Sequence, residues 1–199
     1  MTTTFFLVRH AAHDNLGGYL AGRMEGIRLG PDGRAQAGRL GQRMKRERFH
    51  AIVASPRERT QETAAAISAA TGVTPVRTAE ALDEIDFGPW CGKTFDQLNT
   101  DPEWRRWNDE RGQACTPTGE TMAHVERRVL GLISELAASW RGKALVLVSH
   151  ADVIKAAVCH FLGMPIEGWM RFDIGPASIT TVVTGDWGAK LIGLNEVVD

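Results

Sequence analysis

Histidine, arginine and serine side chains follow three short apolar runs of this 199-residue chain, at the point where each run ends. The three endings are Arg9-His10, Ser55-Pro56-Arg57-Glu58-Arg59 and Ser149-His150. Guanidinium groups and an imidazole supply enough N–H donors for the oxygens of a dianionic phosphate. A neutral imidazole is also a nucleophile that can attack phosphorus. Taken alone, each residue also has an ordinary structural role, so it is their joint occurrence that favours an anion site.

A group that protonates a leaving oxygen is the further requirement of phosphoryl-transfer chemistry. The acidic stretch 82–88, Leu-Asp-Glu-Ile-Asp-Phe-Gly, supplies candidates, although acidic loops are usually only solvated. His10 and His13 form the only close histidine pair, and they lie just past a predicted strand rather than within a helix. This spacing disfavours a metallohydrolase. We therefore predict neither a metal site nor a cofactor.

The elements that must position these side chains alternate between strand and helix. Predicted strands cover 5–8, 51–54, 73–76 and 144–148, and predicted helices cover 30–48, a segment ending at 72, 121–140 and a segment after 150. Two late strands, 179–183 and 189–194, flank a Gly-Asp-Trp-Gly turn and predict a hairpin. The fold class is therefore α/β, a three-layer α/β/α sandwich with a mostly parallel sheet and an antiparallel strand. In such sheets, sites lie at the C-terminal ends of the strands.

The length of the chain predicts one domain over residues 1–199, because 199 residues suffice for one hydrophobic core and not for two. Residues 82–118 are rich in Gly, Pro and Trp, and we interpret them as an excursion with short helices. The part around 90–120 is expected to set substrate specificity. Its residues Trp90, Trp104 and Trp107 either line the site or belong to the core.

Composition excludes several function classes. A formal net charge of -1 means that the chain lacks the overall positive charge that would attract nucleic acid or an anionic membrane surface. No apolar run is long enough to span a membrane, and the first ten residues do not resemble a signal peptide. Three widely spaced cysteines predict neither a disulfide framework nor a thiolate zinc site. The expected location is the cytoplasm, and a homodimer is compatible with the sequence.

Six segments, in order along the chain, resemble motifs of the histidine phosphatase superfamily, the phosphoglycerate-mutase-like proteins. They are Arg9-His10-Ala11, Leu29 to Ala37, Ser55 to Ala64, Leu82 to Gly92, Pro117 to Thr121 and Val148 to Ala151. The resemblance implies the phosphoglycerate-mutase-like fold. It also implies a metal-independent phosphomonoester hydrolase that acts on a small phosphorylated metabolite through a phosphohistidine.

The resemblance assigns roles to five residues. His10 would be the nucleophile and Glu84 the proton donor. Arg9, Arg59 and His150 would bind the phosphoryl oxygens, His150 as a charged donor. We expect Asn15, Gly22 and Ala151 to contribute to substrate binding, although a one-residue deletion before Asn15 weakens its assignment. His13 is expected at the surface.

Two positions depart from the family pattern, because Ala11 and Ala151 stand where the family has glycine. If either backbone required φ > 0, alanine would cost about 1 kcal/mol. Two alternative functions are weighed. A cofactor-dependent phosphoglycerate mutase is disfavoured because its Trp-Asn and Phe-x-Gly-Trp segments are missing, whereas a catalytically silent phosphate-binding module is disfavoured because all five catalytic residue types are present. The sequence does not identify the phosphate ester.

Overall fold

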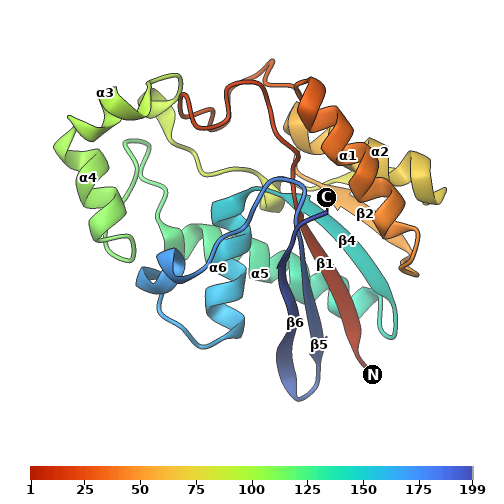
Figure 1. Cartoon of the computed structure of the whole chain (residues 1–199). Coiled ribbons are helices and arrows are strands. Elements are labelled where there is room, and N and C mark those ends of the chain that lie inside the picture. The colour runs from red at the N-terminus through yellow and green to blue at the C-terminus, as the bar shows by residue number, and fades with distance from the viewer. Residues whose placement is uncertain (199) are drawn as a thin grey trace.

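The computed structural model describes residues 1–198 and places a six-stranded sheet between two layers of helices (Figure 1). The strands are β1 (Thr3–Arg9), β2 (Ala51–Ala54), β3 (Val76–Thr78), β4 (Ala144–Ser149), β5 (Ile179–Gly185) and β6 (Gly188–Glu196). The α-helices are α1 (Pro31–Met44), α2 (Glu58–Thr71), α3 (Phe95–Asn99), α4 (Pro102–Asp109), α5 (Met122–Ser139) and α6 (Ala151–Phe161). Short 3-10 helices are η1 (Glu80–Leu82), η2 (Gly88–Trp90) and η3 (Ile166–Arg171).

The order of the strands brings the three predicted polar endings to one edge. The sheet runs β3-β2-β4-β1-β5-β6, in which β1, β2, β3 and β4 pair in parallel and β5 runs antiparallel to both of its neighbours. Arg9 lies opposite Ser149, and Ala54 lies opposite Val148. The residues that follow β1, β4 and β2 are therefore adjacent, as expected for parallel strands.

Both faces of the sheet are covered, which confirms the predicted three-layer architecture. Helices α1 and α2 lie on one face, and α5 and α6 lie on the other (Figure 1). Along β1, Phe5 and Leu7 belong to the hydrophobic core on the α5 side, whereas Phe6 and Val8 belong to the core on the α1 side. A strand that is buried on both faces has a continuous apolar sequence rather than an alternating one.

Most predicted element boundaries are confirmed, and two differ for identifiable reasons. The third strand begins at Val76 rather than at residue 73, because Pro75 has no N–H to donate to the ladder. Helix α1 ends at Met44 rather than near residue 48. Its last carbonyls accept from Arg46 and Glu47 in tight i→i+3 bonds, which is a common way to end a helix.

The segment between β3 and α5 is an excursion with short helices, as predicted. Its tryptophans Trp90 and Trp107 are 1% and 0% exposed, and Trp104 is 8% exposed. All three pack into the same core as the α5 face of the sheet. The core interpretation of these tryptophans is therefore confirmed. In the described part of the chain, no helix has the length and apolarity that crossing a membrane requires.

Candidate active site

Two histidines and one arginine meet at the C-terminal edge of the parallel strands. His10 follows β1, His150 follows β4, and Arg59 lies in the first turn of α2. Their exposed fractions are 3%, 0% and 1%. Arg59 links the two rings, since its Nε lies 3.3 Å from His10 Nε2 and its Nη2 lies 3.2 Å from His150 Nδ1. Three residues that are distant in the sequence thus form one buried cluster.

The His10 ring has one nitrogen that donates to a backbone carbonyl and one that accepts from Arg59. Its Nδ1 lies 2.8 Å from the Ala11 carbonyl, which can only accept, so Nδ1 carries the proton. Nε2 then has a lone pair, and it faces Arg59. Burial, followed by the charges of Arg59 and Arg9, lowers the pKa of His10 well below its usual 6.5. The ring is therefore neutral near physiological pH, which is the state that a nucleophilic imidazole requires.

Arg59 is held in place by a backbone carbonyl. Its Nη2 donates to the Gly22 carbonyl at 2.7 Å, across a span of 37 residues. Gly22 has φ +49°, and a Cβ at this position would lie 2.3 Å from Cys91 Sγ. Glycine is therefore required here by both conformation and space. Gly22 acts through Arg59, which gives a structural reason for the predicted importance of this residue.

We expect Gly22→Ala to impair phosphate recognition. The new methyl group must displace either the Cys91 side chain or the backbone carbonyl of residue 22, which anchors Arg59. The left-handed φ of this position costs alanine about 1 kcal/mol in addition. The expected result is a KM for a phosphate ester raised about tenfold, together with a lower melting temperature. Gly26→Ala is the matched control, because Gly26 also has positive φ, +75°, but has open space around its Cβ position. An equal change in KM for both variants would contradict the anchoring role.

Arginine nitrogens without a partner surround the cluster. Arg9 donates from Nη1 to the Ile174 carbonyl at 2.6 Å. Arg9 Nε and Arg59 Nη1 are buried and have no hydrogen-bond acceptor within residues 1–198. A buried donor without an acceptor is costly unless a ligand supplies one. These two groups are therefore available to bind an anion.

Glu84 brings a carboxyl group to the same cluster. Its Oε2 lies 3.5 Å from His150 Nδ1 and 4.0 Å from Arg59 Nη2. Burial, followed by the nearby Asp152 carboxylate, raises the pKa of Glu84 from 4.5 to about 7. A substantial fraction of Glu84 is therefore protonated at neutral pH. A carboxyl group in this state can donate a proton to a leaving oxygen.

The loop that carries Glu84 is fixed by Glu120, which belongs to the motif at 117–121, and by Arg128, which sequence analysis did not single out. Arg128 of α5 donates from Nη1 to the carbonyls of Ala81 and Asp83 at 2.9 and 2.6 Å. Glu120 pairs with Arg128 at 3.2 Å and accepts the Asp86 N–H at 2.6 Å. The Arg128 position carried no sequence signal, because an arginine on an amphipathic helix is usually only solvated.

The His150 ring is neutral in the free site. Burial, followed by the charges of Arg59 and the neighbouring His10, lowers the pKa of His150 well below 6.5. Its Nδ1 accepts from Arg59, and its Nε2 lies 2.8 Å from Ser55 Oγ. The charged donor expected at this position concerns the transition state of phosphoryl transfer and stays a prediction, whereas burial and the neighbouring cations disfavour that charge in the free site.

The two alanines that replace family glycines carry no backbone strain. Among residues 1–198, the positive-φ residues other than glycine are Ala177 and Asn195 only. Ala11 and Ala151 are therefore tolerated. Ala151 begins α6, whose N-cap residue His150 provides no side-chain cap. The N–H groups of that first turn are accordingly open toward the site.

Two further predicted positions lie beside the cluster rather than in it. Asn15 is exposed in a turn, and it lines a hollow of about 330 Å³ together with His13. His13 is 7% exposed, and its ring is stacked on that of His10 with 6.2 Å between centroids. The expectation of a surface position for His13 is therefore wrong.

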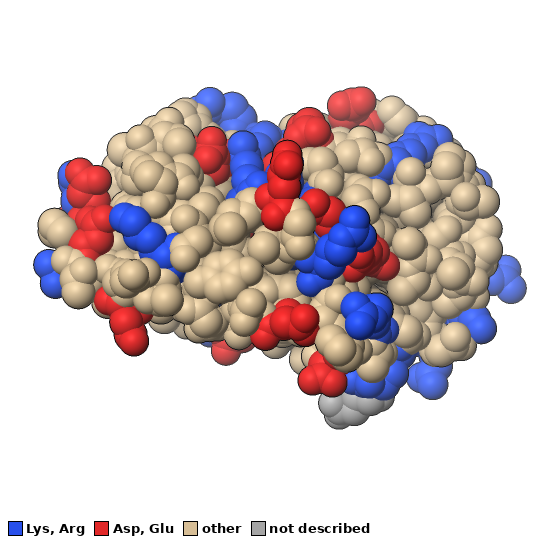
Figure 2. Space-filling view, turned by 90° about the horizontal axis from the view of Figure 1, so that it is seen from above, with Lys and Arg blue, Asp and Glu red and all other residues tan. Residues whose placement is uncertain are grey.

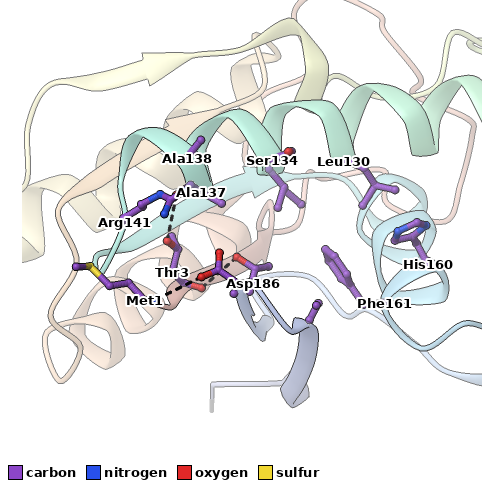
Figure 3. Close-up of a pocket in the computed structure, with 15 residues that line it drawn as sticks. Met1, Thr3, Leu130, Ser134, Ala137, Ala138, Arg141, His160, Phe161 and Asp186 are labelled. Atoms are coloured by element: carbon purple, nitrogen blue, oxygen red, sulfur yellow. Dashed lines mark hydrogen bonds and ion pairs between the residues drawn. The ribbon is translucent and has the colours of Figure 1, made fainter.

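The site lies at the end of the molecule that Figure 2 views from above. Basic and acidic side chains are interspersed there, and no large area of one sign is visible. A separate hollow of about 490 Å³ lies between α5, the end of α6 and the β5–β6 hairpin (Figure 3). Its walls are formed by small and apolar side chains such as Ala137, Leu130 and Phe161. This hollow holds none of the clustered residues.

An α/β/α sandwich with this buried histidine–arginine cluster at its parallel edge defines the phosphoglycerate-mutase-like class of proteins. Comparison with known proteins gives the family. The model of the histidine phosphatase superfamily, branch 1, matches residues 5–197. The chain belongs to this superfamily, and it is a histidine-type phosphatase.

Individual relatives agree with this family. Phosphoserine phosphatase 1 of Hydrogenobacter thermophilus is 32% identical over 182 residues, which cover 88% of this chain and 84% of the relative. A probable phosphoglycerate mutase of Yersinia pestis is 30% identical over 150 residues, covering 74% and 69%. The structure of a mycobacterial glucosyl-3-phosphoglycerate phosphatase is similar with a TM-score of 0.88 at 27% identity, covering 98% of this chain and 100% of the other.

Proposed function

We propose that residues 1–199 form one catalytic domain that hydrolyses a small phosphate monoester through a phosphohistidine at His10. The observation that carries this proposal is the state of the His10 ring. Its Nδ1 donates to the Ala11 carbonyl, and its Nε2 has the lone pair, which accepts from Arg59 Nε in the free site. The unpartnered nitrogens of Arg9 and Arg59 support a phosphoryl group bound next to Nε2.

The reaction proceeds in two balanced steps. His10 Nε2 forms a bond to phosphorus while the ester P–O bond breaks, and Glu84 transfers its proton to the leaving oxygen. Water then attacks phosphorus, the N–P bond breaks, and the Glu84 carboxylate takes the proton of the water. Arg9, Arg59 and a donor from His150 stabilise the charge on the phosphoryl oxygens in both transition states.

We expect chelation of metal ions to leave activity unchanged. In the described residues, no group of three or more His, Cys, Asp or Glu side chains has a metal-binding arrangement. The positive charge of the proposed site comes from Arg9 and Arg59 instead. Incubation with EDTA, followed by an assay with a chromogenic phosphate ester, measures this directly. Loss of activity that Mg²⁺ or Zn²⁺ restores would contradict the proposal.

The substrate is a small phosphorylated metabolite, and residues 90–120 together with the loop before α1 are proposed to select it. Relatives named for phosphoserine and glucosyl-3-phosphoglycerate support phosphorylated three-carbon acids as the first candidates. The free thiols Cys91, Cys115 and Cys159 support a reducing, cytoplasmic setting.

A panel of metabolite phosphates tests the proposal. Purified protein is assayed for phosphate release from phosphoserine, 3-phosphoglycerate, glucosyl-3-phosphoglycerate and α-ribazole phosphate, and kcat/KM is compared. The same 3-phosphoglycerate reaction is examined for 2-phosphoglycerate, since one relative is named a probable mutase. We expect phosphate release to exceed isomerisation. Isomerisation without hydrolysis would identify a mutase, and no turnover of any ester would leave a phosphate-binding module.

A further inference from the structure

One serine hydroxyl joins a buried carboxylate to a site histidine. The Asp83 side chain is 3% exposed, and its Oδ1 accepts from Ser55 Oγ at 3.2 Å. Ser55 is fully buried, and its Oγ lies 2.8 Å from His150 Nε2. A carboxylate can only accept, so the single hydroxyl hydrogen points to Asp83. The Ser55 oxygen must then accept from an N–H on His150 Nε2.

The other nitrogen of His150 agrees with this direction. Nδ1 lies 3.2 Å from Arg59 Nη2, which can only donate, so Nδ1 carries a lone pair in the free site. The Oε2 atom of Glu84 lies 3.5 Å from the same nitrogen. The hydrogen bonds of Asp83, Ser55 and Arg59 are therefore all satisfied by one tautomer of a neutral His150 ring, the one with its proton on Nε2.

The charges around His150 are mainly positive. The groups that face it are Arg59 of α2, Arg9 of β1, His10 after β1, Arg128 of α5, and Glu84 and Asp83 of the loop after η1. Asp83 also pairs with Arg57 at 3.0 Å and with Arg23 at 3.5 Å. In the free site these cations oppose a second proton on the ring. A bound phosphate dianion offsets the charge of the arginines, and Asp83 then acts as a counter-charge along the hydrogen-bond chain.

We propose that Asp83 is a positioning residue that acts on His150 through Ser55. It keeps the proton on Nε2 in the free enzyme and supports uptake of a second proton, from solvent onto Nδ1, when phosphate binds. The doubly protonated ring then donates from Nδ1 to a phosphoryl oxygen, which replaces Nδ1 as the acceptor of the Arg59 Nη2 N–H. This inference rests on the proposed phosphate site, but its test uses inorganic phosphate and requires no turnover.

The free enzyme tests the first half without any variant. ¹⁵N NMR of histidine-labelled protein distinguishes a protonated ring nitrogen from one with a lone pair. His150 is assigned as the signal that is missing in His150→Gln. We expect Nε2–H and an unprotonated Nδ1 in the free protein, and two protonated nitrogens at neutral pH with saturating inorganic phosphate. A free ring with its proton on Nδ1, or a ring that stays neutral at saturating phosphate, would overturn the proposal.

Two variants test the connection. Asp83→Asn keeps an oxygen that accepts from Ser55 but removes the charge, and Ser55→Ala removes the link. We expect each variant to lower the pH at which phosphate-bound His150 loses its second proton by about one unit, equivalent to a tenfold change in proton affinity. Because Asp83 Oδ1 also lies 4.0 Å from His150 Nε2, adding Asp83→Asn to Ser55→Ala should cause a further shift, but a clearly smaller one than Asp83→Asn causes alone.

Asp86→Asn is the matched control, since Asp86 belongs to the same loop and lies 3.9 Å from the same Arg23. It does not contact Ser55, and we expect it to leave the titration of His150 unchanged. An equal shift of the His150 titration in Asp86→Asn would mean that Asp83 acts only by its general charge. That result, or fully additive shifts in the variant that combines Asp83→Asn with Ser55→Ala, would refute the connection through Ser55. If Asp83→Asn does not fold, the tautomer of the wild-type protein still decides the first half. Failure of phosphoryl transfer to His10 would refute the proposed function without altering this result.

Discussion

His10→Ala is expected to abolish both turnover and covalent labelling. The wild-type protein, quenched rapidly without acid after mixing with a ³²P-labelled ester, should yield an acid-labile, base-stable phosphoenzyme. Peptide mapping should place the label on the peptide that contains His10. Because the nucleophile forms the intermediate itself, its removal should lower kcat to roughly one part in ten thousand or less. His10 and His150 each have a ring nitrogen that accepts from Arg59, so the position of the label is what decides which ring is the nucleophile.

His150→Ala serves as the control for this experiment. His150 is equally buried and contacts Arg59, but its Nε2 bonds to Ser55 and its Nδ1 accepts from Arg59. The variant should slow phosphoryl transfer without moving the label. Label on His150, on a serine or on a cysteine would contradict the assignment of the nucleophile.

Glu84→Gln is expected to separate substrates by their leaving groups. An alkyl leaving oxygen needs a proton in the transition state, whereas a nitrophenolate leaves without one. The variant should therefore lose roughly 10²- to 10⁴-fold in kcat for an alkyl phosphate and about tenfold or less for p-nitrophenyl phosphate. Glu120→Gln is a useful comparison, because it alters the loop support without removing the acid. Equal losses on both substrates would assign Glu84 a binding role only.

The pH profile should report the same acid. The pKa of Glu84 is raised to about 7, so the proton donor is lost as the pH rises through that value. For an alkyl phosphate, kcat/KM should fall above about pH 7. Protonation of His10 should not cause a fall near pH 6.5, because the pKa of that ring is lowered well below its usual 6.5. Glu84→Gln should remove the alkaline fall, and a fall that persists would point to another group.

The fold follows from the sequence largely because its central strands are buried on both faces. Leu145, Val146, Leu147 and Val148 form a continuous apolar run, and all are 0% exposed. The pairing of Arg9 with Ser149 was not predicted, because the sequence does not give the order of the strands. The start of the third strand was not anticipated, because its position depends on where Pro75 interrupts the ladder rather than on apolarity.

The sequence predicts the site residues that directly follow strands. It does not predict those whose burial or protonation depends on contacts between distant segments. His10, Arg59 and His150 meet as expected. The buried state of Asp83 was not predicted, because its partners Arg57 and Arg23 come from distant segments and their contact leaves no local pattern. The neutral state of His150 in the free site has no sequence signal either, because it depends on burial and on the summed charge of a cluster that only the folded chain brings together.

The position of β1 has a consequence for how the enzyme is made. This strand, which His10 directly follows, is translated before the rest of the sheet, and both of its neighbours, β4 and β5, are translated much later. A nascent chain that ends before Ala144 already contains Arg59 and Glu84 but has no partner on either side of β1. Pairing across such sequence separations is slow compared with local folding. Activity should therefore arise after synthesis rather than during it, and until then the apolar first strand depends on chaperones or transient contacts for protection from aggregation.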